Sequence, residues 1–292
     1  MQALSQAEKL KNALTEINQD SAEYPKEWQN LPDKPQTLYA LGNISLLQTR
    51  KFAVVGSRTT PQTALKLGEK LAEELSSSIT LVTGTADGGD SAAIEGALRG
   101  SGKIVCLLAG GFSAMPQSNL PLLRKVAKQG LLLSPHSFET PVRNFSYAYR
   151  NKLLAALCEG VLVLGAGEKS GALLTANHAI ENKKPVFALP YPPNAANGVG
   201  CNGLIKRGAY LTETAQDIAE RLGLSLSPKT NAVPLSETEK IVYAALRERT
   251  EIHINELAQI TGVPPFKLRA VLSSLEVKGL CVAVGGNRYA LV

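Results

Sequence analysis

Six short apolar runs, each apolar at consecutive positions, are the feature that most constrains how this chain can fold. Alternating hydrophobicity is typical of a strand with one face in solvent, whereas a continuous run such as residues 104–108 predicts a strand covered on both faces. Segments with helical spacing separate the runs, as expected of a parallel sheet enclosed by helices. The predicted strands cover residues 51–55, 79–83, 103–109, 130–134, 160–165 and 185–189. The predicted helices cover residues 61–77, 90–100, 117–129, 146–158, 171–182 and 214–222.

The patterns divide the chain into four parts. Residues 46–225 predict an α/β domain with an extended Rossmann-like, doubly wound parallel sheet. Residues 1–45 predict a short helical and extended N-terminal leader, because helical spacing is followed by X-Pro steps that favour extended backbone. Residues 226–235 predict a linker. Residues 236–292 predict a C-terminal winged-helix domain, since three helical segments are followed by a β-hairpin pattern.

The charge of the chain is concentrated in its centre. The net charge is +6, and residues 46–225 hold 19 Lys and Arg against 13 Asp and Glu. Residues 236–292 hold 7 against 6. A polyanion is therefore expected to bind the central domain rather than the winged helix.

Composition excludes several classes of protein. No apolar run reaches the roughly 18 residues that a membrane span needs, and the first twenty residues lack the apolar core of a secretory signal. The four cysteines and three histidines are scattered, so no metal site and no cofactor are predicted. Unclustered thiols suit a reducing cytoplasm, which is the predicted location. The scattered residues are Cys106, Cys158, Cys201, Cys281, His136, His178 and His253.

The first predicted strand ends in a turn suited to anions. Gly56, Ser57 and Arg58 follow it, and a helical pattern begins after Pro61. A helix N-terminus has unpaired N–H groups and partial positive charge, so it can bind a phosphate. Arg58 adds a planar fork of donors. The turn alone is a weak signal, because a tight turn with a solvated Arg58 fits the same residues.

Three further segments have a related character. Residues 83–90 contain three glycines whose backbone N–H groups can close around a phosphate, with Asp90 as a predicted helix cap. Residues 165–171 form a second glycine-rich loop. Residues 143–152 interleave cations and aromatic rings, which is typical of a surface that pairs phosphates and stacks bases. A helix with a solvated basic face and a core Phe145 is the alternative for that segment.

In this order, the motifs resemble the bacterial DNA processing protein A family (DprA, also called Smf). The likeness covers residues 24–222, with a winged helix where many family members have one. The matching segments are Tyr24-Pro25, Leu38-Tyr39, Val54-Val55-Gly56-Ser57-Arg58, Thr83-Gly84-Thr85-Ala86, Arg150-Asn151-Lys152, Ser170-Gly171-Ala172-Leu173-Leu174-Thr175-Ala176, Pro185-Val186-Phe187-Ala188-Leu189-Pro190 and Gly200-Cys201-Asn202-Gly203-Leu204-Ile205-Lys206-Arg207-Gly208-Ala209.

The resemblance implies a homodimer that binds single-stranded DNA and acts as a recombination mediator. Such a protein protects incoming strands in natural transformation and loads the recombinase RecA on them, with no enzymatic step on the DNA. Phe145 would stack on a base. The residues implied to bind DNA or phosphate are Gly56, Ser57, Arg58, Gly84, Phe145, Arg150, Lys152, Ser170, Gly171, Thr175, Lys206 and Arg207.

The chain departs from the family pattern at several positions. Asp87 stands where a basic residue is usual, Ile94 replaces a His, and Pro135 replaces a Glu. Gly89 replaces an Ile, and Lys152 replaces an Arg, which removes a bidentate fork. An acid beside a phosphate loop is expected to weaken anion binding. These departures indicate a divergent paralogue.

Two other classes of function stay open. One is a DprA-like paralogue that senses nucleic acid or nucleotide in regulation or defence, with a winged helix that binds a promoter or a protein. The other is a Rossmann enzyme that cleaves nucleotides. Its acid would be Glu168, helped by Asp87 or Asp90.

Overall fold

The computed structural model describes residues 6–226, 235–249 and 251–291. The chain divides into two compact units between Ser227 and Pro228, and each unit is described by itself. Residues 1–5 of the predicted leader and residues 227–234 of the predicted linker lie outside the described residues. Within the described ranges, every helix is too short or too polar to cross a membrane.

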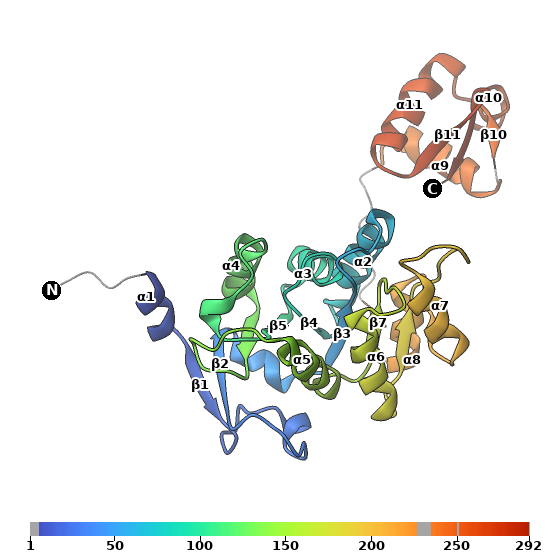
Figure 1. Cartoon of the computed structure of the whole chain (residues 1–292). Helices are drawn as coiled ribbons and strands as arrows, with labels where there is room; N and C mark the ends of the chain where they lie inside the picture. Colours follow the sequence, from blue (N-terminus) through green and yellow to red (C-terminus); the bar gives the residue numbers. More distant parts are fainter. Residues whose placement is uncertain (1–5, 227–234, 250, 292) are drawn as a thin grey trace. The chain divides into compact units, whose positions relative to one another are not determined.

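The first unit is built on a nine-stranded sheet in the order β1-β2-β6-β5-β4-β3-β7-β8-β9 (Figure 1). Strands β3 to β9 pair in parallel. All residues of β3 to β8 are buried, so the continuous apolar runs predicted these strands and their double coverage correctly. The strands are β3 (Lys51–Val55), β4 (Thr80–Thr83), β5 (Ile104–Leu107), β6 (Leu131–Ser134), β7 (Val161–Val163), β8 (Val186–Ala188) and β9 (Tyr210–Leu211).

Helices cover both faces of this sheet (Figure 1). Successive residues of β3 belong alternately to two different hydrophobic cores. Phe52 and Val54 lie in one core with α2, α3, α4 and α8, whereas Ala53 and Val55 lie in the other with α5, α6 and α7. The helices are α2 (Gln62–Leu75), α3 (Gly89–Arg99), α4 (Leu120–Gln129), α5 (Asn144–Leu157), α6 (Gly171–Glu181), α7 (Val199–Lys206) and α8 (Ala215–Leu222). The sequence patterns missed α7 and β9, because one is eight residues long with two glycines and the other has two exposed residues.

The N-terminal segment was predicted as a helical and extended leader, but it also contributes two strands to the sheet. After α1 (Gln6–Asn12), it forms β1 (Thr15–Asn18) and β2 (Thr37–Gly42), which add to the sheet antiparallel to one another and to β6. Strand β1 buries a single residue, so it lacks the apolar run that revealed the other strands. Trp28 anchors this segment to the domain, because its ring is fully buried and its Nε1 donates to the carbonyl of Leu153 at 2.9 Å.

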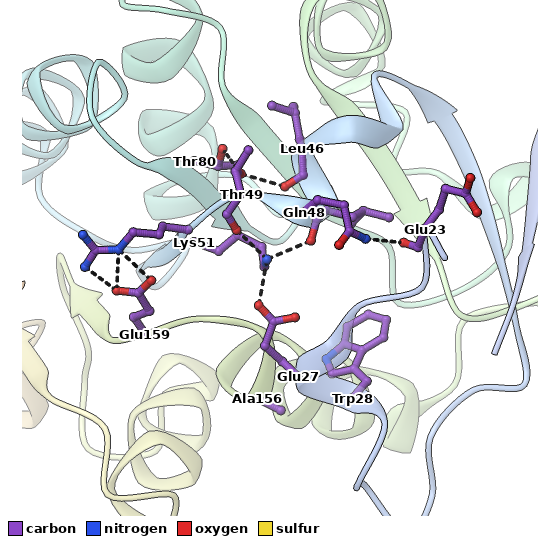
Figure 2. Close-up of polar contacts among 12 residues, drawn as sticks. Glu23, Glu27, Trp28, Leu46, Gln48, Thr49, Lys51, Thr80, Ala156 and Glu159 are labelled. Atoms are coloured by element: carbon purple, nitrogen blue, oxygen red, sulfur yellow. Dashed lines mark hydrogen bonds and ion pairs between the residues drawn. The ribbon is translucent and has the colours of Figure 1, made fainter. Parts of the chain in front are cut away.

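An ion pair between buried Lys51 and exposed Glu27 joins this segment to the amino end of β3 (Figure 2). Lys51 is 2% exposed, and its Nζ lies 2.8 Å from the carboxylate of Glu27. The same ammonium donates to the carbonyls of Leu47 at 2.9 Å and Thr49 at 2.6 Å, so its donors are satisfied inside the protein. Removing Glu27 would leave the buried Lys51 charge without its counter-ion, which is destabilising.

The second unit has the winged-helix arrangement that the sequence predicted. Three helices accompany a small sheet in the order β10-β12-β11. Ser236 caps the first helix, and the carboxylate of Glu239 accepts a hydrogen bond from the Ser236 N–H at 2.7 Å. The elements are α9 (Glu237–Arg247), β10 (Ile252–His253), α10 (Ile254–Thr261), α11 (Pro265–Val277), β11 (Cys281–Gly285) and β12 (Arg288–Leu291).

Candidate nucleic-acid interface

The order of the strands creates a crevice beside β3. The chain runs from β3 to β4, β5 and β6 on one side and then crosses to β7 and β8 on the other. At such a switch point the loops after neighbouring strands leave in opposite directions, and ligands of open α/β sheets bind between them. A cavity of about 480 Å³ lies there, between the loops that follow β3, β4 and β7.

The cavity wall combines these three loops with one face of α5. Eight of the twelve site residues predicted from the sequence belong to it: Gly56, Ser57, Arg58, Gly84, Arg150, Ser170, Gly171 and Thr175. The remaining lining residues are Val55, Thr59, Ala86, Asp90, Tyr147, Asn151, Leu154, Gly167, Glu168, Lys169 and Ala172.

Two predicted residues of α5 lie outside the cavity wall. Phe145 is 66% exposed in the first turn of the helix, which excludes the alternative of a core phenylalanine. Lys152 forms an ion pair with Asp33, with 2.7 Å between Nζ and Oδ1, and lowers the pKa of that carboxyl. The charge of Lys152 is therefore already partly compensated.

Lys206 and Arg207 are not brought to the cavity. They stand at the end of α7, which begins after β8 and returns the chain toward the amino end of the sheet. Arg207 lines a different hollow, together with Lys183 and Arg221. The family resemblance implied that these cations bind phosphate, and the sequence patterns did not predict α7, the helix that they end.

Close backbone contact joins the first loop to the N-terminus of α3. A Cβ atom on Gly89 would lie 2.3 Å from the Cα of Gly56, so a side chain there would force the two segments apart. The N–H of Gly89 also donates to the carbonyl of Ser57 at 3.3 Å. Asp87, the acid at the usually basic position, accepts a hydrogen bond from the Ser118 hydroxyl at 3.1 Å and does not line the cavity.

Arg150 lines the cavity, but its side chain is buried and hydrogen-bonded to protein groups. Its exposed fraction is 6%. Nε donates to Oδ1 of Asn151 at 2.9 Å, and Nη1 donates to the carbonyl of Leu107 at 3.1 Å. Nη1 also lies 4.0 Å from Oδ2 of Asp90. The guanidinium thus contacts its neighbour in α5, the carboxyl end of β5 and the first turn of α3.

Asp90 does not act as the helix cap that the sequence predicted. Gly88 is the N-cap of α3, and Asp90 lies in the first turn with its carboxylate buried. Oδ2 accepts a hydrogen bond from the N–H of Ala86 at 3.1 Å, so the side chain reaches back to the loop instead. Burial raises the pKa of Asp90, and Arg150 opposes that rise.

The open positive charge of the cavity comes from Arg58 and Lys169. Both side chains are exposed, and neither has a hydrogen-bond or ion-pair partner among the described residues. They stand beside the N-terminus of α6, where the Ser170 hydroxyl accepts the N–H of Ala172 at 3.3 Å. An anion in the cavity would therefore meet two cations and a helix N-terminus, with Glu168 as the opposing exposed carboxylate.

Sequence reasoning missed Lys169, Tyr147 and Asn151 as lining residues. Lys169 stands in a loop that was recognised as glycine-rich, and Asn151 stands inside the matched Arg-Asn-Lys motif. The signal was therefore present for these two, since each adjoins a residue already chosen. The sequence gives no reason to place Tyr147 in the cavity wall and Phe145 outside it. Tyr147 is 41% exposed.

Comparison with protein families gives two matches in chain order. Residues 15–223 match the family model of DNA recombination-mediator protein A, and residues 226–287 match the model of the DprA winged helix domain. The DNA processing protein DprA of Streptococcus pneumoniae is 34% identical over 196 residues, which are 67% of this chain and 70% of the relative. Protein Smf of Escherichia coli is 30% identical over 290 residues, which are 94% of this chain and 77% of the relative.

Two solved structures have the same fold. The X-ray structure of DNA processing protein A from Streptococcus pneumoniae superposes with a TM-score of 0.69 at 31% identity, over 75% of this chain and 77% of that one. The protein from Helicobacter pylori gives a TM-score of 0.65 at 30% identity, over 73% of this chain and 97% of that one. The Helicobacter structure is described as giving insight into that protein's single-stranded DNA binding mode.

Proposed function

This chain belongs to the DNA recombination-mediator protein A family, and we propose that it binds single-stranded DNA at the cavity beside β3. The observation that carries the proposal is that an exposed arginine, Arg58, lines the cavity. Its guanidinium is exposed and without a protein partner in the described chain, and it stands among backbone loops and a helix N-terminus. A phosphate is the anion that such donors fit.

Other residues extend the contact from one phosphate to a strand. Lys169 and the loop residues Gly56, Ser57, Gly84 and those of the α6 N-terminus would hold neighbouring phosphates. The exposed ring of Phe145 would stack on a base, because aromatic rings bind every base through its face. Such binding depends on the charge of the DNA phosphates and on base stacking, and it does not depend on the DNA sequence.

The biological role we propose follows the family. The protein would act as a cytoplasmic homodimer that protects single strands, in natural transformation or another DNA-processing pathway, and loads a RecA-type recombinase on them. No reaction on the DNA is part of this role.

The test is fluorescence anisotropy of a labelled oligo-dT at two salt concentrations. Wild type should bind, and Arg58→Ala should weaken binding about tenfold while lowering the slope of log affinity against log salt by about 0.7. Arg124→Ala, which removes an exposed arginine of α4 outside the cavity wall, is the matched control and should change neither quantity. Absence of binding at low salt would refute the proposal.

A second candidate function is nucleotide cleavage, which one observation favours. Glu168 is an exposed carboxylate in the cavity wall, and a cleavage reaction needs an acid at such a place. Release of free base from nucleotides, lost in Glu168→Gln, would support the enzyme. Unchanged nucleotides after prolonged incubation would reject it.

A further inference from the structure

We infer that Arg150 is a positioning residue of the cavity, which holds the surrounding loops in place through Asp90, Asn151 and the Leu107 carbonyl. The inference rests on the proposed function, since the loops in question are those that would hold the DNA. It reverses the role that the sequence suggested for Arg150, that of a direct phosphate contact.

Burial and compensation separate Arg150 from Arg58. Nε and Nη1 of Arg150 donate to protein oxygens, and the carboxylate of Asp90 lies 4.0 Å away. A buried guanidinium that already faces a carboxylate gains less from a phosphate than an unpaired one, because its charge is compensated. Arg58 is exposed, and its charge acts on Asp90 only through space, with no hydrogen bond or ion pair to the described chain.

The loop after β4 rests directly on this pair. A Cβ atom on Gly84 would lie 1.8 Å from Nη1 of Arg150 and 2.3 Å from Oδ2 of Asp90. Asp90 also accepts the N–H of Ala86 at 3.1 Å. The backbone of residues 84–86 therefore packs directly against the Arg150–Asp90 ion pair. Only glycine at position 84 leaves room for this contact.

Asn151 extends the support to α6. Its Oδ1 accepts the N–H of Arg150 Nε at 2.9 Å, and its Nδ2 donates to the carbonyl of Gly171 at 3.1 Å. Gly171 is the first residue of α6, whose N-terminus borders the cavity. One continuous set of contacts thus joins α3, β5, α5 and α6 where they meet the proposed DNA site.

Lysine should not replace Arg150 in this task. An ammonium keeps the charge but has no planar fork, so it cannot reach Asn151, Leu107 and Asp90 in the same geometry. A direct phosphate contact would tolerate lysine better. Arg150→Lys therefore separates the two roles.

The experiment combines amide hydrogen exchange of the DNA-free protein with oligo-dT binding. In Arg150→Lys, we expect exchange in residues 84–90 and 169–173 to rise about tenfold or more, and affinity to fall about tenfold. Unchanged exchange in both segments would overturn the inference. Because exchange is measured without DNA, it decides the role of Arg150 even where wild type fails to bind oligo-dT and the proposed function is rejected.

The variant Asp90→Asn is a second test, because the two roles of Arg150 predict opposite changes in DNA affinity. If Arg150 positions the loops, loss of the ion pair loosens residues 84–86 and lowers affinity by several fold. If Arg150 contacts a phosphate, removal of the nearby negative charge raises affinity while exchange in residues 84–86 stays unchanged, and that outcome would overturn the inference. Glu27→Gln is the control for general destabilisation, because it breaks the Lys51 pair at the amino end of β3 (Figure 2). It should not raise exchange selectively in the two loop segments.

Discussion

Oδ2 of Asp90 lies 4.0 Å from Nη1 of Arg150, and both side chains are buried in the wall of the cavity beside β3. Arg58, in the wall of the same cavity, is exposed and has no such partner in the described chain. The two arginines therefore differ in role: the charge of Arg150 is compensated inside the protein, and the charge of Arg58 is open to a ligand. This division would let the cavity bind the proposed polyanion although a buried acid lies in its wall.

Phe145→Ala should weaken oligo-dT binding without destabilising the protein. Base stacking on an aromatic ring is worth about 1–3 kcal/mol by alanine substitution, which corresponds to roughly a 5- to 150-fold loss of affinity. The ring is 66% exposed, so its removal leaves no cavity in the core. Anisotropy at two salt concentrations and a thermal melt measure both effects. Phe145→Trp should restore binding, and a salt slope that changes in Phe145→Ala would argue against stacking.

The double variant Lys206→Ala, Arg207→Ala should bind oligo-dT within twofold of wild type. Both residues stand at the end of α7, and Arg207 lines a hollow other than the cavity beside β3. A short oligonucleotide that fills one site gives the cleanest measurement. A salt slope lowered by about 0.7 or more would show that a phosphate reaches these cations, as the sequence suggested.

Gly84→Ala should destabilise the first unit and weaken DNA binding together. The added Cβ would lie 1.8 Å from Nη1 of Arg150, so the guanidinium or the loop must move, at a cost of about 1–3 kcal/mol. Gly203→Ala is the matched control, because a Cβ there meets nothing within 4 Å and the residue lies inside α7. It should leave the melting temperature unchanged or raise it. Equal melting temperatures for the two variants would contradict the packing described for Gly84.

Glu239→Gln should weaken the winged-helix unit at neutral pH but not near pH 2. Lys278, the Ser236 N–H and the Ser274 hydroxyl hold the pKa of Glu239 at about 2, below its ordinary value of 4.5. Because the folded pKa is depressed, the stabilisation is complete above the ordinary value and is lost as pH falls toward the folded one. Urea titrations at pH 7, 4 and 2.5, followed by amide signals of α9 and α11, would measure it. A difference between variant and wild type that persists undiminished at low pH would exclude this origin.

Local sequence patterns were enough to predict the parallel strands β3 to β8 and the winged helix. Burial on both faces of a strand requires apolar residues at consecutive positions, so β3 to β8 could be located from local composition. Glycines at the strand ends likewise marked the loops that enclose the cavity. The sequence patterns did not predict strands β1 and β2. Strand β1 buries a single residue, and its pairing with β2 forms only in the folded sheet.

Only the tertiary structure decided which cations are open to a ligand. Arg58, Arg150, Lys152 and Arg207 look alike in a sequence, since each is a basic residue near a plausible phosphate site. Their fates depend on partners far along the chain: Lys152 meets Asp33, 119 positions away, and Arg150 meets the carbonyl of Leu107, 43 positions away. A charge is available or compensated according to its neighbours in space, and the folding of distant segments against one another supplies those neighbours.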